Sequence, residues 1–105
     1  MTYHGEGLTA LADPTRRSIF ELLAERPRAV GELAGEMPVS RPAVSQHLRV
    51  LTEAGLVMDR ADGSRRIYQV DPDGVDALRA YLERFWKRAL TSFKAAVERT
   101  DEEQR

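Results

Sequence analysis

SRPAVSQHLRVLTEAGLVMDRADGSRRIYQV, residues 40–70, is the stretch of sequence that decides the fold. It begins with Ser40, a residue type that accepts a hydrogen bond at a helix N-terminus. Gly55 follows fifteen residues later, and glycine is favoured just after a helix C-terminus. At 100° per residue, three apolar side chains between them share one side of the helix: Val44, Leu48 and Leu51. The spacing therefore predicts a helix over residues 40–54 with one buried face.

A hairpin follows this helix. Residues 56–61 (LVMDRA) and 64–70 (SRRIYQV) have the composition of strands, and they flank Asp62-Gly63, a dipeptide typical of tight turns. Alternation along the second strand places Tyr68 and Val70 on one face, which we expect to point inward. The sequence thus predicts two antiparallel strands after the helix.

Caps and prolines divide the remaining chain into helices. Leu8, Leu11 and Ala12 indicate a short first helix, and Asp13-Pro14 begins a second one that Pro27 ends. A third helix is predicted over residues 30–37, before Pro38. Asp71-Pro72 begins the last, which runs to about Thr100. Residues 1–100 are expected to form a single domain, and residues 101–105 a frayed tail.

This order of elements is that of a winged helix-turn-helix. The expected class is mainly α (α+β), with about five helices, a two-stranded β-hairpin wing and a dimeric assembly. The chain has 105 residues, which suits one domain, and it contains no Cys. Disulfide frameworks, zinc ribbons and thiol nucleophiles are therefore excluded. Its apolar runs are too short for a membrane helix, and MTYHGEGL does not resemble an export signal, so we expect a cytoplasmic protein.

Charge is distributed unevenly along the chain. The formal net charge is −1, which by itself argues against a nucleic-acid partner. Residues 39–70, however, carry five Arg against three acidic side chains and are net positive, whereas both flanking blocks are net negative. The middle third of the chain is therefore expected to meet an anionic partner.

The exposed side of the 40–54 helix has side chains suited to DNA. Gln can bond bidentately to adenine, Arg to guanine, and Ser to several bases, while the helix N-terminus offers N–H groups to a phosphate. A merely solvated surface is the alternative. On the hairpin, Arg65 and Arg66 follow the turn, and Arg60 lies on the partner strand, where they can reach phosphates or a minor groove. The expected DNA-binding residues are Ser40, Arg41, Pro42, Ser45, Gln46, Arg49, Arg60, Arg65 and Arg66.

The stretch that begins at Ser40 resembles the recognition helix and wing of the ArsR/SmtB family of repressors. The resemblance extends upstream to ALADPTRRSIFELL and VGELA and covers roughly residues 8–72. It implies a homodimeric, DNA-binding repressor that occupies an inverted repeat near a promoter, often that of its own operon. It also implies that the first and last helices build the dimer interface.

The metal sites of this family are not expected here. Where the family motif has two cysteines at the start of the third helix, this chain has Ala29 and Gly31, and its last helix has no His. We therefore expect no metal and no cofactor. Asp71, Asp73 and Asp76 could hold a hard cation, but helix capping explains them better. His47, on the edge of the buried side of its helix, is interpreted as a structural residue, with a phosphate contact or pH sensing as the alternative.

The last helix carries more apolar surface than one small core can cover. Two neighbouring stripes run along it at three-four spacing, which predicts a second copy of the chain as partner. A ligand pocket lined by its aromatic residues is the alternative. The expected interface residues are Leu8, Leu11, Leu78, Leu82, Phe85, Trp86, Ala89 and Phe93.

A homodimeric transcriptional repressor is therefore the leading hypothesis for function. A winged-helix dimer that mediates protein contacts without binding DNA is the second, and the acidic flanks of the chain are its best support. An enzyme is not expected, because the pattern offers neither a catalytic set of His, carboxylate and nucleophile nor a glycine-rich phosphate loop. The sequence does not identify a small-molecule inducer.

Overall fold

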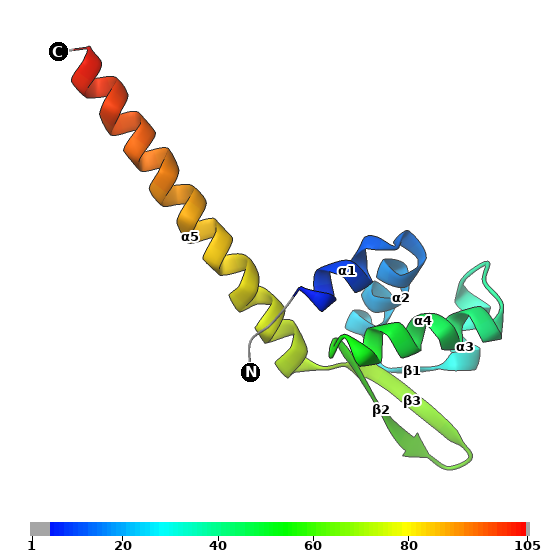
Figure 1. Cartoon of the computed structure of the whole chain (residues 1–105). Helices are drawn as coiled ribbons and strands as arrows, with labels where there is room; N and C mark the ends of the chain where they lie inside the picture. The colour runs from blue at the N-terminus through cyan, green and yellow to red at the C-terminus, as the bar shows by residue number, and fades with distance from the viewer. Residues whose placement is uncertain (1–4, 105) are drawn as a thin grey trace.

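The computed structural model describes residues 5–104, so His4 lies outside the described range. Within that range, the chain has five helices and a three-stranded sheet, and the last helix projects from the small body that the other elements form (Figure 1). The elements are α1 (Glu6–Ala12), α2 (Pro14–Glu25), β1 (Arg28–Ala29), α3 (Val30–Glu36), α4 (Arg41–Glu53), β2 (Val57–Asp62), β3 (Arg65–Val70) and α5 (Pro72–Glu103).

Side-chain caps begin the three longest helices where the sequence predicts them. The Asp13 carboxylate accepts a hydrogen bond from the Arg16 N–H at 2.9 Å, and the Ser40 hydroxyl accepts one from Ala43 at 3.3 Å. At α5, Asp71 accepts from the Asp73 N–H at 3.0 Å. Each cap satisfies a backbone donor that the first helical turn leaves without a partner. The capping interpretation of Asp71 is thereby confirmed.

The sheet has one strand more than the predicted hairpin. β1 pairs antiparallel with β3, and β3 with β2, which gives the order β1-β3-β2. A two-residue strand carries no periodic pattern, so the sequence alone did not indicate β1. The hairpin turn also lies one residue later than predicted. Asp62 pairs with Arg65, and Gly63, at φ 64°, takes the first central position of the turn, where a left-handed conformation is needed.

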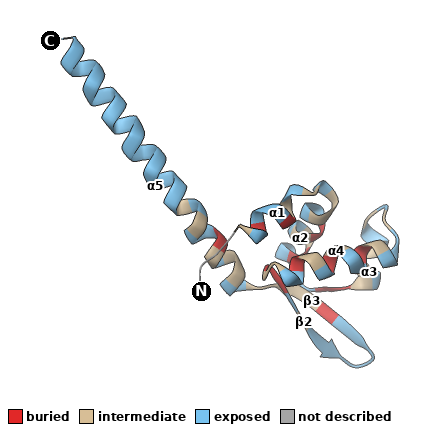
Figure 2. Cartoon of the chain, viewed as in Figure 1, coloured by how far each residue is buried: buried red, intermediate tan, exposed pale blue. Residues whose placement is uncertain are grey.

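The core lies where α1 to α4 meet the base of the sheet. Val44, Leu48 and Leu51 are buried as the spacing of α4 predicts, and they pack in one cluster with Ile19 and Leu33 of the neighbouring helices. On β3 the buried residue is Ile67, while Tyr68 and Val70 are half-buried against the cluster. α4 is therefore fixed along one side, and its other side faces solvent (Figure 2).

The start of α5 is packed tightly against the end of α4. Gly55, at φ 79°, forms the predicted left-handed terminus of α4. A Cβ added to Gly74 would lie 1.6 Å from the Gly55 carbonyl oxygen, so only glycine fits at this crossing. The Asp71 N–H also donates to the Leu56 carbonyl at 2.9 Å. These contacts join the base of α5 directly to the end of α4.

Beyond its first turns, α5 leaves the body as a single long rod (Figure 1). The radius of gyration is 19.2 Å, compared with about 13 Å for a compact domain of this length. The helix continues to Glu103, past the expected end near Thr100, and residues 101–103, expected to be frayed, are helical. No Gly or Pro follows Gly74 to break the helix. None of the helices in the described range is long and apolar enough to cross a membrane.

Candidate nucleic-acid interface

The solvent side of α4 carries the residues that the sequence predicts for reading DNA. Ser45, Gln46 and Arg49 are exposed there, as are Ser40, Arg41 and Pro42 at its N-terminal end. Their backbone is held by the buried side opposite and by the Ser40 cap. We call this set the α4 face, and it presents a fixed array of donors and acceptors. His47 is half-buried beside it, which agrees with a structural role.

Two open hollows join the α4 face to the wing. One, of about 450 Å³, is lined on α4 by Ser45 and Arg49 and on the wing by Asp59 and Tyr68. The other, of about 600 Å³, lies between the N-termini of α3 and α4 and the wing, and Arg41, Arg65 and Arg66 all line it. The structure thus brings five predicted residues from two elements to one continuous surface.

Arg60, the third predicted wing residue, is not part of this surface. Arg60 pairs in register with Ile67, whereas Asp59 pairs with Tyr68 and Ala61 with Arg66. Because neighbouring residues of a strand point to opposite faces, Arg60 lies on the other face of the wing from Arg66. Arg60 is exposed but does not line either hollow.

The five predicted DNA-binding arginines differ in their partners. Arg65 at the wing tip lies 3.7 Å from a Glu32 oxygen and 3.9 Å from an Asp62 oxygen, and Arg66 donates to Asp59. The Asp59 carboxylate raises the pKa of Arg66 above its ordinary value. Arg41, Arg49 and Arg60, by contrast, have no ion pair or side-chain hydrogen bond within residues 5–104. Three of the cations are free for an external anion, and two are already paired.

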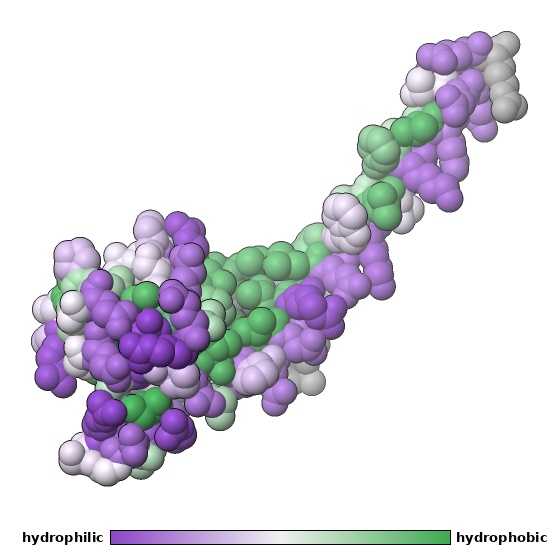
Figure 3. Space-filling view, turned by 180° about the vertical axis from the view of Figure 1, so that it is seen from behind, coloured by the Kyte–Doolittle hydropathy of each residue, from purple (hydrophilic) through white to green (hydrophobic). Residues whose placement is uncertain are grey.

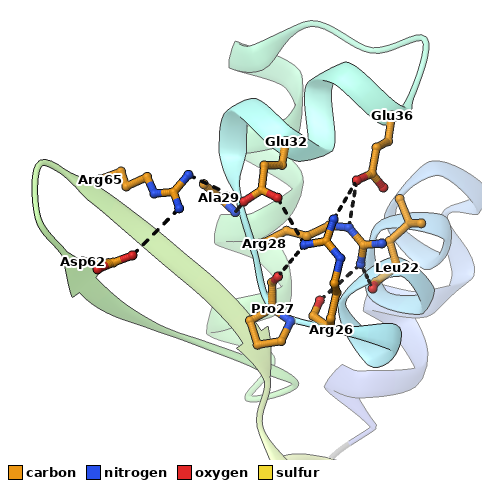
Figure 4. Close-up of polar contacts among 9 residues, drawn as sticks. All are labelled: Leu22, Arg26, Pro27, Arg28, Ala29, Glu32, Glu36, Asp62 and Arg65. Atoms are coloured by element: carbon orange, nitrogen blue, oxygen red, sulfur yellow. Dashed lines mark hydrogen bonds and ion pairs between the residues drawn. The ribbon is translucent and has the colours of Figure 1, made fainter.

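An ion-pair network beneath the wing was not predicted from the sequence (Figure 4). Arg28 of β1 is only 5% exposed; it donates to the Leu22 carbonyl and, at 3.0 Å, to Glu36. Arg26 bridges Glu36 and Glu32, at 3.5 and 3.1 Å. A buried charge requires such partners. Two Arg and two Glu close together in the sequence were the available signal.

The predicted dimer residues fall into two groups. Leu78 is 8% exposed and belongs to the core of its own chain, and Leu11 is half-buried against that core. The others are exposed, and on α5 they form part of an apolar band that continues outward from the body (Figure 3). Trp86 and Phe93 are 66% and 67% exposed, values that a single chain does not normally give to large aromatic residues.

No metal centre is formed by the part of the chain that the structure describes, since three His, Asp or Glu side chains nowhere gather in the right arrangement. At the start of α3, Ala29 and Gly31 stand beside Arg41, whose guanidinium carbon would lie 3.6 Å from a Cβ on Gly31. The Arg41 guanidinium and the Glu32 carboxylate both line this position, and neither Ala29 nor Gly31 has a side chain that could bind a metal ion.

Comparison with known proteins agrees with this geometry. A family model described as a helix-turn-helix domain matches residues 11–60. The chain is 62% identical over 89 residues to the HTH-type transcriptional regulator Rv2034 of Mycobacterium tuberculosis, which covers 85% of this chain and 83% of that protein.

Two solved structures are also similar. An ArsR-like transcriptional regulator from Rhodococcus sp. RHA1 aligns with a TM-score of 0.74 at 31% identity, over 86% of this chain and 88% of that one. The second is a homodimeric winged helix-turn-helix DNA-binding domain, Mb0332 of Mycobacterium bovis, described as a possible ArsR-family regulator. It aligns with a TM-score of 0.65 at 30% identity, over 79% of this chain and 77% of that one.

Proposed function

Because the chain belongs to the ArsR/SmtB family of winged helix-turn-helix transcriptional regulators, we propose that it is a homodimeric repressor that occupies an inverted-repeat operator. The observation that carries the proposal is the α4 face. It combines two arginines that have no partner in the described chain with Ser45 and Gln46, all on a helix fixed by its buried side. Such a face fits a major groove.

The residues divide by the part of DNA that they would contact. Gln46 and Ser45, with Arg49, read base edges, because their side chains offer matched donors and acceptors. Arg41 and the wing arginines contact phosphates, which fixes the register without selecting a sequence. Ser40 and Pro42 lie at the N-terminus of α4, where the backbone N–H groups favour a phosphate. The regulator would act in the cytoplasm, where its DNA is.

A second copy of this chain would cover the apolar band of α5. Trp86, Ala89, Phe93 and Ala96 alternate large and small side chains at three-four spacing. If two copies run antiparallel, with the twofold axis midway between Ala89 and Phe93, each aromatic ring meets an alanine of the other copy. Such a pairing is isologous and closes as a dimer. Leu82 and Phe85 extend the band toward the body, and Leu8 of α1 adds to it.

The charges of α5 also favour an antiparallel arrangement. Basic residues occupy the middle of the helix, and acidic residues dominate its end. Parallel helices would place the two acidic ends together, whereas antiparallel helices bring each toward the basic middle of the partner. The residues concerned are Arg84, Lys87, Arg88 and Lys94 in the middle, and Glu98, Asp101, Glu102 and Glu103 at the end.

Selection of genomic DNA fragments by the purified protein tests the proposal. We expect a two-fold symmetric motif with half-sites about 10 bp apart, or a multiple of that. Affinity for the recovered DNA should fall steeply when salt rises from about 50 to about 200 mM. Binding that does not depend on salt, or no recovered motif, would favour the protein-interaction module instead.

Sedimentation of a Phe93→Glu variant tests the dimer separately. A charge in the middle of the band should convert the dimer to a folded monomer, because Phe93 makes no core contact within its own chain. Thr91→Glu, on the exposed side of α5 opposite the band, is the matched control, because it adds the same charge outside the proposed interface. A variant that remains dimeric would place the interface elsewhere.

A further inference from the structure

Arg65 at the wing tip is tied to the body of the domain through Glu32. The Arg65 Nη1 lies 3.7 Å from the Glu32 Oε1, and its Nη2 lies 3.9 Å from the Asp62 Oδ2 (Figure 4). Asp62 belongs to the wing and moves with it. Glu32 belongs to α3, so its ion pair is the one that bridges the wing tip and the helical body.

Glu32 itself is held in place by two further contacts. Its Oε1 accepts a hydrogen bond from the Ala29 N–H at 3.1 Å, and its Oε2 accepts one from Arg26 at 3.1 Å. These contacts lower the pKa of the Glu32 carboxyl, the backbone hydrogen bond first and the Arg26 contact second, so the group is ionised at neutral pH. Any shift of Glu32 away from α3 toward Arg65 would cost it both contacts.

We propose that Glu32 is a fixed counter-anion that occupies, for Arg65, the place of a DNA phosphate, and thereby lowers sequence-independent binding by the wing. The inference rests on the proposed DNA-binding function. A phosphate contact has the same strength on every sequence, so a wing arginine that must first leave a carboxylate adds less to non-specific affinity. Arg41 and Arg49 on the α4 face meet no such carboxylate within residues 5–104. Glu32 is therefore a positioning residue that shifts the balance of binding from the wing to the α4 face.

The direct test replaces Glu32 with Gln. E32Q removes the charge that Arg65 meets, while the Gln carbonyl can still accept from the Ala29 N–H. Binding to a duplex without the operator is measured by fluorescence anisotropy at several salt concentrations. We expect the affinity to rise about 1.5- to 5-fold, the range that an exposed ion pair is worth. The plot of log affinity against log salt should steepen by up to about one, as for one added phosphate contact.

Glu36→Gln is the matched control, because Glu36 is the other carboxylate of α3 in the network. It pairs with Arg26 and Arg28 but has no contact with Arg65. E36Q removes the same charge from the same helix and should leave the salt slope unchanged. If E36Q steepens the slope as much as E32Q does, the effect comes from net charge alone and the proposal is wrong.

The double variant E32Q/R65A shows whether the effect passes through Arg65. In the R65A background, E32Q should change neither affinity nor slope, and a change that persists overturns the proposal. R65A alone gives the same information without disturbing α3, because Arg65 is on the exposed wing tip. It should reduce the slope less than R41A does, since Arg41 is not neutralised within the described chain. An equal loss in both variants contradicts the proposal even if E32Q fails to fold.

Measurements on the wild-type protein distinguish a failure of this proposal from a failure of the proposed DNA-binding function on which it rests. If the wild type shows no salt-dependent binding to any duplex, the DNA-binding function itself is refuted. If the wild type binds and E32Q has the wild-type slope, only the role of Glu32 is refuted.

Discussion

The α4 face and the wing tip are both basic and exposed, yet they hold their charges differently. Arg41 and Arg49 lack partners in the described chain, whereas Arg65 and Arg66 lie against carboxylates of α3 and of the wing. A net charge therefore does not measure attraction to DNA. What matters is which cations are free, and two of the three free arginines, Arg41 and Arg49, lie on the element that can also read bases.

The two regions also differ in how much of each is packed against the core. α4 buries three large side chains in the core along one side. The wing is anchored at its base by Ile67 and by the pairing of β1 with β3, and its outer part is exposed. We infer that α4 is the fixed part of the interface and that the wing adapts to it. Four experiments test this contrast.

Leu51→Ala should have the largest effect. Leu51 is completely buried under α4, and its truncation leaves a cavity that should lower the free energy of unfolding by about 2–5 kcal/mol. Thermal or urea denaturation measures the loss. Thr52→Ala, on the exposed side of the same helix, should change stability by less than about 0.5 kcal/mol. A similar loss in both variants would mean that the packing of Leu51 does not hold α4 in place.

Gln46→Ala should have the next largest effect, and on sequence preference rather than on stability. Losing one bidentate base contact should cost about 1–3 kcal/mol of discrimination against the wrong base at one operator position. Competition between the selected operator and duplexes changed at single positions measures this preference. Gln104→Ala at the far end of α5 is the control. If Gln46→Ala leaves the preference intact, another residue reads the operator.

Arg41→Ala and Arg66→Ala should have smaller and unequal effects on the salt dependence. Loss of the free Arg41 should reduce the salt slope by about one, as for one phosphate contact. Loss of Arg66 should reduce it less, because this arginine must leave Asp59 before it can reach a phosphate. Titrations at several salt concentrations give both slopes. A greater reduction for Arg66→Ala would reverse the contrast between the two regions.

Among the four experiments, lowering the pH should show the smallest effect, a change in stability that depends on Glu32. The pKa of the Glu32 carboxyl is lowered in the folded protein, so its contribution to stability is present above the pKa that Glu32 has in the unfolded chain and is lost as pH falls through the lower folded value. E32Q should therefore show a shallower loss of stability between about pH 5 and 3 than the wild type. Urea denaturation at several pH values checks this.

Asp13 offers a control for the acid experiment that is distant from the wing in the sequence. The Arg16 N–H lowers the pKa of this helix-capping carboxyl too, so Asp13→Asn should flatten the same pH range. Unlike E32Q, it should leave DNA binding unchanged. Equal acid sensitivity in the wild type and both variants would show that neither carboxyl titrates differently on folding.

Local sequence signals predicted the elements that position the interface. Asp13, Ser40 and Asp71 each cap a helix through a contact only two or three residues away, which a sequence displays directly. The buried side of α4 follows from helical spacing alone. The exposed residues of the α4 face could then be predicted by elimination.

The features that could not be predicted from the sequence depend on residues that are far apart along the chain. β1 is a strand only because β3 supplies its partner, 38 residues later at the Ala29–Ile67 pair. The ion pair of Arg65 with Glu32 depends on the same tertiary arrangement. Leu78 was predicted to lie in the dimer interface but is in the core. It lies near the start of α5, where the apolar stripe of this helix still packs against the body.

The contrast between the two regions is tested most directly by the ratio of affinities for the operator and a scrambled duplex, measured for Gln46→Ala and Arg66→Ala together. The account predicts that Gln46→Ala lowers this ratio and leaves the salt slope unchanged. It predicts that Arg66→Ala weakens both duplexes alike and leaves the ratio unchanged. A ratio that falls with Arg66→Ala and survives Gln46→Ala would contradict the assignment of sequence reading to the α4 face.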